Sequence, residues 1–227
     1  MNIGVLGSGA VGQTIAARLV EVGHEVTLGT RDVAALLART EPGMGQSESF
    51  AAWHGQHPRI VLGTFAETAA HGEVLFNCTA GGASLAALGQ AGAGRLGSKI
   101  LIDVANALDF SAGFPPTLSV VNTDSLGEQI QRAFPALRVV KALNTVTAAV
   151  MADPGLVAGG DHSVFVCGED AAARAAVADY LRRWFGWREV IDLGGISAAR
   201  GTEMYLPLWL RLMGALDTPA FNIKVVR

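Results

Sequence analysis

Three glycines near the start of the chain, spaced Gly7-x-Gly9-x-x-Gly12, directly follow the apolar run Asn2–Leu6. This order suits a strand, a tight turn and a helix whose first N–H groups face a pyrophosphate. Gly7 permits the turn, Gly9 the approach of the pyrophosphate, and Gly12 the packing of helix on strand. The predicted dinucleotide-binding turn consists of Gly7, Ser8, Gly9, Ala10, Val11 and Gly12. The alternative is a tight strand-to-helix turn that binds nothing.

The end of the second predicted strand indicates which dinucleotide the turn binds. NAD-binding domains carry an acidic residue at this strand tip, where it binds the ribose 2′-hydroxyl. Here the tip reads Gly29-Thr30-Arg31. Thr30 can hydrogen-bond a phosphate, and Arg31 can pair with it and stack on adenine, so the sequence predicts NADP. In the alternative, Asp32 binds the ribose of NAD, but Asp32 also fits as the N-cap of the next helix.

Small or neutral polar residues follow three further predicted strands. Ligands of open parallel sheets bind beyond the carboxyl ends of the strands, so these turns should meet at one edge. Such residues suit a flat ring and hydrogen bonds to a carboxamide, although each alone could simply be a turn residue. The predicted ring-binding residues are Thr79, Ala80, Gly81, Asn106, Asn144 and Thr145.

No acid–base pair is evident at these strand ends. None of the five histidines follows a strand, and Lys141 lies within one, so the direction of its side chain is ambiguous. We therefore expect no catalytic side chain and no metal site, but hydride transfer between two redox rings, which needs only stacking and orientation from the protein. Cys78 and Cys167 each end an apolar run and are predicted to be buried free thiols.

Composition narrows the class of protein. Half of the 227 residues are hydrophobic, 16% are charged, and the net charge is -3 without a basic block. Nucleic acid is therefore not an expected partner. No apolar run approaches the roughly 18 residues of a membrane span, and no signal peptide is evident. We expect a soluble, cytoplasmic protein with a small-molecule redox acceptor as its partner.

Strands and helices are predicted to alternate up to residue 145, which indicates an α/β fold with a Rossmann-type, doubly wound parallel sheet. The segment Ala107–Val120 is expected to be a loop. The predicted strands are Asn2–Leu6, Val26–Leu28, Ile60–Leu62, Val74–Cys78, Lys99–Val104 and Arg138–Ala142. The predicted helices are Ala10–Val22, Asp32–Ala38, Phe50–His54, Phe65–Ala70, Leu85–Leu88 and Ser125–Phe134.

The pattern changes after Thr145, so residues 1–145 are predicted to form the dinucleotide-binding domain and residues 146–227 a small α/β extension. The extension should contribute to the acceptor site. Its predicted elements are a helix through Met151, strands Ser163–Cys167 and Glu189–Asp192, and helices Ala171–Phe185 and from Ala199 onward. The last helix is apolar all round, so it is expected to be buried, either in the core of the chain or in a homodimer interface.

The chain resembles the coenzyme F420-dependent NADP oxidoreductases and, related to them, the reductase domains of six-transmembrane ferric reductases. The resemblance covers nearly the whole length. Beyond the glycine turn and Gly29-Thr30-Arg31, it rests on Leu143-Asn144-Thr145, Val166-Cys167-Gly168-Glu169-Asp170, Asp192-Leu193-Gly194, Ala199-Arg200, Leu206-Pro207-Leu208 and Asn222-Ile223-Lys224. It implies hydride exchange between NADPH and coenzyme F420, with the 2′-phosphate on Thr30 and Arg31.

Two alternatives to this function stay open, one of them another enzyme activity and the other a non-catalytic function. Where some relatives have apolar or aromatic residues and a histidine, this chain has Ala80-Gly81-Gly82 and Asn144, so the second ring could also be a flavin. An NADPH-dependent flavin or ferric reductase and a non-catalytic NADP-binding sensor therefore stay open. Imine and 3-hydroxyacid reductases add a long helical C-terminal domain, for which this chain is too short.

Overall fold

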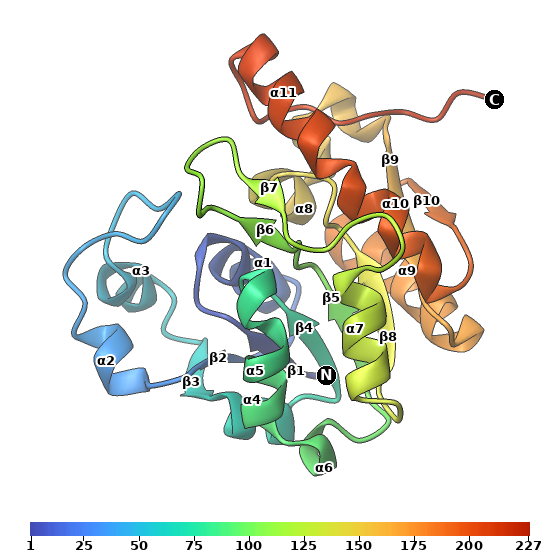
Figure 1. The fold of residues 1–227 in the computed structure, drawn as a ribbon. Coiled ribbons are helices and arrows are strands. Elements are labelled where there is room, and N and C mark those ends of the chain that lie inside the picture. Colours follow the sequence, from blue (N-terminus) through green and yellow to red (C-terminus); the bar gives the residue numbers. More distant parts are fainter.

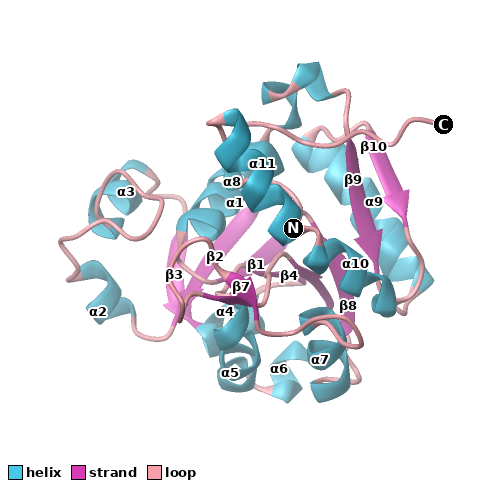
Figure 2. Cartoon of the chain, turned by 45° about the horizontal axis from the view of Figure 1, so that its top comes forward, coloured by secondary structure: helices cyan, strands magenta, loops and turns pink.

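Short apolar runs separated by glycine-rich turns form one eight-stranded sheet in the computed structural model, which describes all residues 1–227. The strand order is β10-β9-β8-β5-β4-β1-β2-β3, and all neighbours are parallel except β8 and β9. The predicted α/β, doubly wound fold is confirmed (Figures 1 and 2). The strands are β1 (Asn2–Leu6), β2 (Glu25–Thr30), β3 (Val61–Thr64), β4 (Val74–Asn77), β5 (Ile100–Asp103), β8 (Arg138–Ala142), β9 (Ser163–Cys167) and β10 (Glu189–Asp192).

Helices cover both faces of the sheet because successive side chains of each strand point to opposite sides. On β4, for example, Phe76 joins one buried cluster and Leu75 the other. The α-helices are α1 (Ala10–Glu21), α2 (Val33–Leu37), α3 (Phe50–Gln56), α4 (Phe65–His71), α5 (Gly81–Ala91), α6 (Ala93–Leu96), α7 (Leu126–Ala133), α8 (Ala148–Ala152), α9 (Ala171–Phe185), α10 (Ala199–Met204) and α11 (Leu206–Leu216). Helices α1, α8 and α9 pack in the first cluster, and α4 to α7 in the second.

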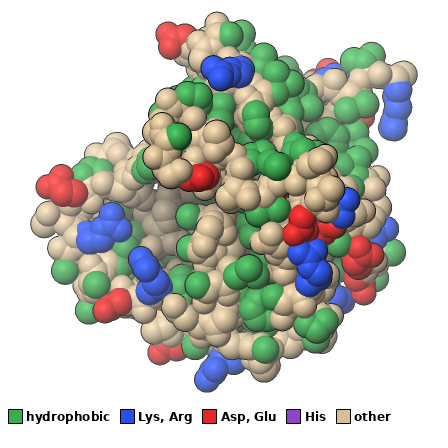
Figure 3. Space-filling model, viewed as in Figure 1, with side chains coloured by type: hydrophobic (Ala, Val, Ile, Leu, Met, Phe, Trp, Pro, Cys, Tyr) green, Lys and Arg blue, Asp and Glu red, His purple; other side chains and the backbone are tan.

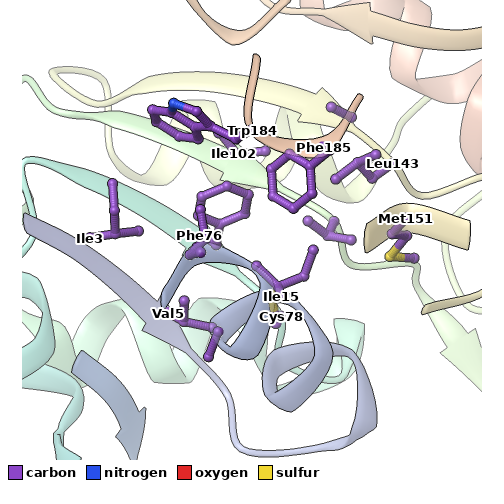
Figure 4. Close-up of a cluster of buried hydrophobic side chains, with 14 of the residues drawn as sticks. Ile3, Val5, Ile15, Phe76, Cys78, Ile102, Leu143, Met151, Trp184 and Phe185 are labelled. Carbon is purple, nitrogen blue, oxygen red and sulfur yellow. The ribbon is translucent and has the colours of Figure 1, made fainter. Parts of the chain in front are cut away.

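The first cluster joins the two halves of the chain. Ile15 of α1 and Phe76 of β4 share it with Phe185 of α9, and the ring centroids of the two phenylalanines are 6.1 Å apart (Figure 4). A continuous core therefore underlies residues on both sides of position 145. The division into two domains at that position stays a prediction.

The structure differs from the predicted elements in three segments, of which the first is α6, a helix with no predicted counterpart. The expected loop Ala107–Val120 contains a short antiparallel pair, β6 (Leu108–Asp109) and β7 (Thr117–Leu118), which is too short to show an apolar period. The expected last helix is two helices, α10 and α11, with Pro207 in the first turn of the second. Proline lacks a backbone N–H and suits a helix start, so a new helix begins here.

Helix α11 is not an intrachain core helix, contrary to one of the two expectations. Of its residues only Leu206 is buried, whereas Leu208 and Leu216 are 55% and 54% exposed. The apolar pattern correctly indicated a helix with no polar face, but it carried no information on what would cover that face. No helix in the structure is both long and apolar enough to cross a bilayer.

Candidate active site

The glycine turn between β1 and α1 brings backbone within van der Waals distance of backbone. Gly7 has φ +115°, and a Cβ there would lie 2.6 Å from the carbonyl oxygen of Cys78. A Cβ on Gly12 would overlap the carbonyl oxygen of Gly7. By contrast, a Cβ on Gly9 would meet no atom within 4 Å. Gly7 and Gly12 therefore permit the packing of α1 on the sheet, and Gly9 leaves the space above the turn open for a ligand.

The N-terminus of α1 is free to bind an anion. Gly9 is the N-cap, no side chain caps the helix, and no acidic residue lies in its first turn. The unpaired N–H groups and the helix dipole favour a phosphate at this position. The turn thus fits a pyrophosphate group.

A cavity of about 800 Å³ extends from this turn to the tip of β2. Its rim carries Thr30 and Arg31, as predicted, and also Arg39, which the sequence analysis missed. Neither arginine forms an ion pair within the chain. Figure 3 shows basic side chains beside a hollow on this face of the molecule. Arg39 follows α2, and only the course of that helix brings it back to the rim.

Asp32 also lines this cavity, but its carboxylate is already engaged by the protein. Its Oδ1 accepts a hydrogen bond from the backbone N–H of Ala35 at 2.9 Å and so caps α2. The predicted N-cap is confirmed. A carboxylate held in this way stabilises the helix, and the residues at and directly after the end of β2 are the neutral Thr30 and the basic Arg31.

A second cavity, of about 460 Å³, continues from the first along the carboxyl edge of the sheet, and Cys78, Thr79 and Ala80 line both. The turns after β4, β5 and β8 meet here, as the sequence analysis expected. Of the predicted site residues, the first cavity is lined by Gly7, Ser8, Gly9, Thr30 and Arg31, and the second by Ala10, Val11, Gly81, Asn106, Asn144 and Thr145. Gly12 lines neither, because it lies beneath the turn.

Two asparagines join the turns after β5 and β8. Asn106 Nδ2 donates to the carbonyl oxygen of Asn144 at 2.8 Å, and Asn144 Nδ2 donates to Asn106 Oδ1 at 3.0 Å. The hydroxyl of Thr145 is buried without a hydrogen-bond partner. An orphaned buried hydroxyl is costly in a folded protein, and a ligand carboxamide would satisfy it. Leu143, with φ 62°, holds the turn in the strained left-handed region.

The residues that line the second cavity carry no acidic or basic side chain. Burial raises the pKa of the Cys78 thiol, and the charge of Asp103 raises it further, so the thiol stays neutral. Both cysteines are buried and unbridged, as predicted. No group of His, Cys, Asp or Glu side chains is arranged to hold a metal ion. The cavity can stack and orient a ring, but it offers no proton donor of ordinary strength.

The outer wall of the second cavity comes from the β6–β7 loop and from α11 of the extension, whose individual site residues the sequence did not indicate. Phe110 of the β6–β7 loop, Leu206 and Trp209 line it. The indole N–H of Trp209 is buried without a partner, and its ring lies stacked 5.4 Å from that of Phe221. Because the sequence shows α11 only as an all-apolar helix, no local signal could have placed Trp209 at the site.

The sequence analysis also missed a buried ionic cluster behind the second cavity. The side chain of Lys141, whose direction was ambiguous from sequence, is fully buried and contacts Asp103 and Glu203. A lysine within an apolar strand was the available signal, but Glu203 follows it by 62 residues (203 − 141) and no pattern joins the two.

The doubly wound fold, the glycine turn and two continuous cavities at the carboxyl edge are those of a Rossmann-type dinucleotide-binding protein. Comparison with known proteins specifies the family. The family described as coenzyme F420-dependent NADP oxidoreductase matches residues 2–107. A structure from Arthrobacter sp. FB24, provisionally described as an F420-dependent NADP reductase, is 57% identical, with TM-score 0.96 and 100% of both chains covered. The chain belongs to the coenzyme F420-dependent NADP oxidoreductase family and is an NADP-dependent oxidoreductase.

More distant relatives share parts of this architecture. The chain is 30% identical over 216 residues to the metalloreductase STEAP3 of Rattus norvegicus, covering 92% of this chain but only 38% of the length of that protein. An imine reductase from Bacillus cereus has TM-score 0.61 at 13% identity, covering 95% of this chain and 61% of that one. The similarity to the imine reductase shows the fold alone. The predicted family, fold class and NADP-dependent enzyme class are confirmed; the roles of single residues stay predictions.

Proposed function

We propose that the protein transfers a hydride between NADPH and coenzyme F420 or a flavin-like acceptor, with both rings in the second cavity. The observation that carries the proposal is the chemistry of that cavity, which is continuous with the dinucleotide site and is lined by neutral groups. Reduction of a carbonyl needs a proton donor beside the reacting oxygen. Hydride transfer between two rings needs stacking, orientation and exclusion of water, and these the cavity can supply.

In this proposal the dinucleotide lies along the edge of the sheet. Thr30 and Arg31, with Arg39 beside them, would hold the 2′-phosphate, and the N-terminus of α1 at Gly9 and Ala10 would hold the pyrophosphate. NADP(H), when bound, supplies or accepts the hydride at its nicotinamide ring. Charge-assisted hydrogen bonds from arginine are the strongest of these contacts.

The nicotinamide end of the dinucleotide would bind at the turns after β4, β5 and β8. Backbone groups of Ala80 and Gly81 allow a close approach, and the hydroxyl of Thr145, which has no partner within the chain, would hydrogen-bond the carboxamide. A Cβ on Gly81 would overlap the carbonyl oxygen of Asn106, so this glycine also lets α5 pack on the turn after β5. The Asn106–Asn144 pair then holds the two turns at a constant separation.

The acceptor ring is assigned to the apolar wall opposite these turns. Trp209 and Phe110 offer aromatic faces for stacking, and Leu206 closes the back of the wall. Aromatic contacts and the removal of water favour a flat, largely apolar ring. The C-terminal extension, residues 146–227, would contribute this wall through α11.

A second candidate, NADPH-dependent reduction of a free flavin and through it of ferric iron, is favoured by the similarity to the rat metalloreductase. This candidate shares the hydride transfer from NADPH to a ring, so the identity of the ring decides between it and the coenzyme F420 form of the first candidate. Purified protein is given NADPH with coenzyme F420, FMN or FAD, and oxidation of NADPH is followed by absorbance. Turnover with F420 alone supports the first candidate, and turnover with FMN or FAD alone supports the second. NADPH binding without turnover on any acceptor would refute both and indicate an NADP-binding sensor.

A further inference from the structure

Behind the second cavity, one lysine holds two carboxylates in a fully buried cluster. Lys141 Nζ lies 2.6 Å from Asp103 Oδ2 and 2.8 Å from Glu203 Oε1, and it donates a hydrogen bond to the carbonyl oxygen of Ala105 at 2.7 Å. The side chains are 0%, 0% and 1% exposed for Lys141, Asp103 and Glu203. Burial alone would lower the pKa of Lys141, but the charges of the two carboxylates outweigh it and raise the pKa, so the ammonium stays charged.

Such a cluster contributes little net stability to a core. Removing three charges from water is unfavourable, and their mutual attraction offsets this only when the geometry is good. Apolar side chains of equal total volume often give a core that is as stable. Lys141 Nζ contacts three oxygen atoms, one of a backbone carbonyl and two of carboxylates. The ionic groups therefore need a reason other than stability, and their contacts supply one.

The partners of Lys141 connect it to different walls of the second cavity. The carbonyl of Ala105 belongs to the turn after β5, whose next residue, Asn106, exchanges hydrogen bonds with Asn144. Lys141 itself is the penultimate residue of β8, three residues before Asn144. The turns after β5 and β8 are thus joined at two points, by the contact of Lys141 with Ala105 and by the Asn106–Asn144 pair.

Asp103 extends the connection to the turn after β4. Its Oδ1 accepts a hydrogen bond from Asn77 Nδ2 at 2.8 Å, and Asn77 Oδ1 accepts one from the hydroxyl of Thr79 at 2.7 Å. Thr79 lines both cavities. The turn that joins the dinucleotide cavity to the second cavity is therefore held by the same ammonium through two hydrogen bonds.

Glu203 extends the connection to the C-terminal wall. It lies in α10 and accepts hydrogen bonds from the backbone N–H groups of Leu126 and Gly127 at 2.8 and 3.1 Å. Leu206 and Trp209, which line the second cavity, follow it on the next helix. The position of α11 over the cavity thus depends on an anchor that reaches the sheet through Lys141.

We propose that Lys141, through Asp103 and Glu203, is a positioning residue that aligns the three strand-end turns and α11 for hydride transfer. The inference rests on the proposed placement of both rings in the second cavity. Lys141 touches neither ring, since it does not line the cavity. Its loss should change the geometry of the ring site while leaving the distant 2′-phosphate site intact.

The test separates these two sites. Lys141→Met and Glu203→Gln are compared with wild type at a temperature well below the unfolding temperatures of all three proteins. The first measurement is the binding of 2′-phospho-ADP-ribose, which lacks nicotinamide. The second is the single-turnover rate of hydride transfer. Binding should stay within about twofold, because distant sites act independently. The rate should fall about 100-fold, the order expected when reacting groups are displaced by about 1 Å. If Lys141→Met does not fold, Glu203→Gln decides, because glutamine keeps the shape of glutamate and its single amide oxygen can still accept from one of the two N–H groups, that of Leu126 or that of Gly127.

Arg200→Met is the matched control. Arg200 also lies on α10 and pairs with Glu128 of α7 at 2.6 Å, but it contacts no turn of the cavity. It should lower the unfolding temperature and leave the rate of hydride transfer near that of wild type. Equal losses of rate in Arg200→Met and Lys141→Met, or an unchanged rate in both Lys141→Met and Glu203→Gln, would overturn the proposal.

Failure of the proposed function gives a different result. If wild type fails to oxidise NADPH with every acceptor tested, the proposed function is refuted. The fluorescence anisotropy of bound NADPH then tests the positioning role. A nicotinamide ring held rigidly in wild type and mobile in both variants would support that role. Equal anisotropy in all three proteins would refute it.

Discussion

Replacing Arg31 by alanine should weaken the binding of NADPH and leave that of NADH almost unchanged. Arg31 lies on the rim of the dinucleotide cavity and has no carboxylate partner within the chain, so its charge is available to a 2′-phosphate. NADH has a 2′-hydroxyl there and gains little from a guanidinium group. The difference between the two nucleotides therefore isolates the phosphate contact.

The size of the effect follows from the contact and its exposure. A charge-assisted hydrogen bond contributes about 1.5–3 kcal/mol, which corresponds to a roughly 10- to 150-fold change in Kd. Arg31 is exposed, and Arg39 stays beside it on the rim. Solvent screening and the second cation favour the lower end of the range, about tenfold.

Titration calorimetry with each nucleotide measures both values of Kd. Arg95→Ala is the matched control, because this exposed arginine lies on α6 and lines neither cavity. It should change neither Kd. Raising the salt concentration should weaken NADPH binding to wild type more than to Arg31→Ala, since salt screens exposed charges. Equal losses for NADPH and NADH in Arg31→Ala would refute the assignment of the 2′-phosphate.

Three further predictions follow from other parts of the structure. Gly12→Ala should lower the unfolding temperature, because its Cβ overlaps a backbone carbonyl, whereas Gly9→Ala should keep the unfolding temperature and weaken NADPH binding. If α11 forms a homodimer interface, as we propose from its exposed apolar face, Leu208→Glu should give a monomer in light scattering; an unchanged mass would refute that interface. Arg132 lowers the pKa of Asp124 to about 2. A lowered carboxyl pKa contributes stability above its unfolded value of about 4, so the stability advantage of wild type over Arg132→Ala should vanish as the pH falls from there to 2.

Much of the architecture could be predicted from local patterns. Strands β1, β8, β9 and β10 begin and end at the predicted residues, and β4 and β5 lie within the predicted bounds, because each is a short apolar run between turn residues. The N-cap at Asp32 was predicted because the signal for a cap is a single residue before a helix. The meeting of the three strand-end turns followed from the rule that parallel strands end at one edge.

The parts that could not be predicted depend on contacts between distant segments. Arg39 reaches the dinucleotide cavity only because α2 turns the chain back toward β2. The exposed position of α11 could not be inferred, because an apolar helix can be covered by its own chain or by another. The direction of Lys141 was ambiguous for a related reason, since a strand pattern gives the alternation of side chains but not the groups they meet.

The sequence by itself determined the alternating α/β order, the dinucleotide turn and the neutral strand ends, because each is encoded by neighbouring residues with short-range steric demands. Only the tertiary structure decided which polar groups are paired and which are left for a ligand. Lys141 is satisfied by Asp103 and Glu203, whereas the hydroxyl of Thr145 has no partner. Burial makes both outcomes matter, since an unpaired polar group in a low-dielectric interior costs far more than one in water.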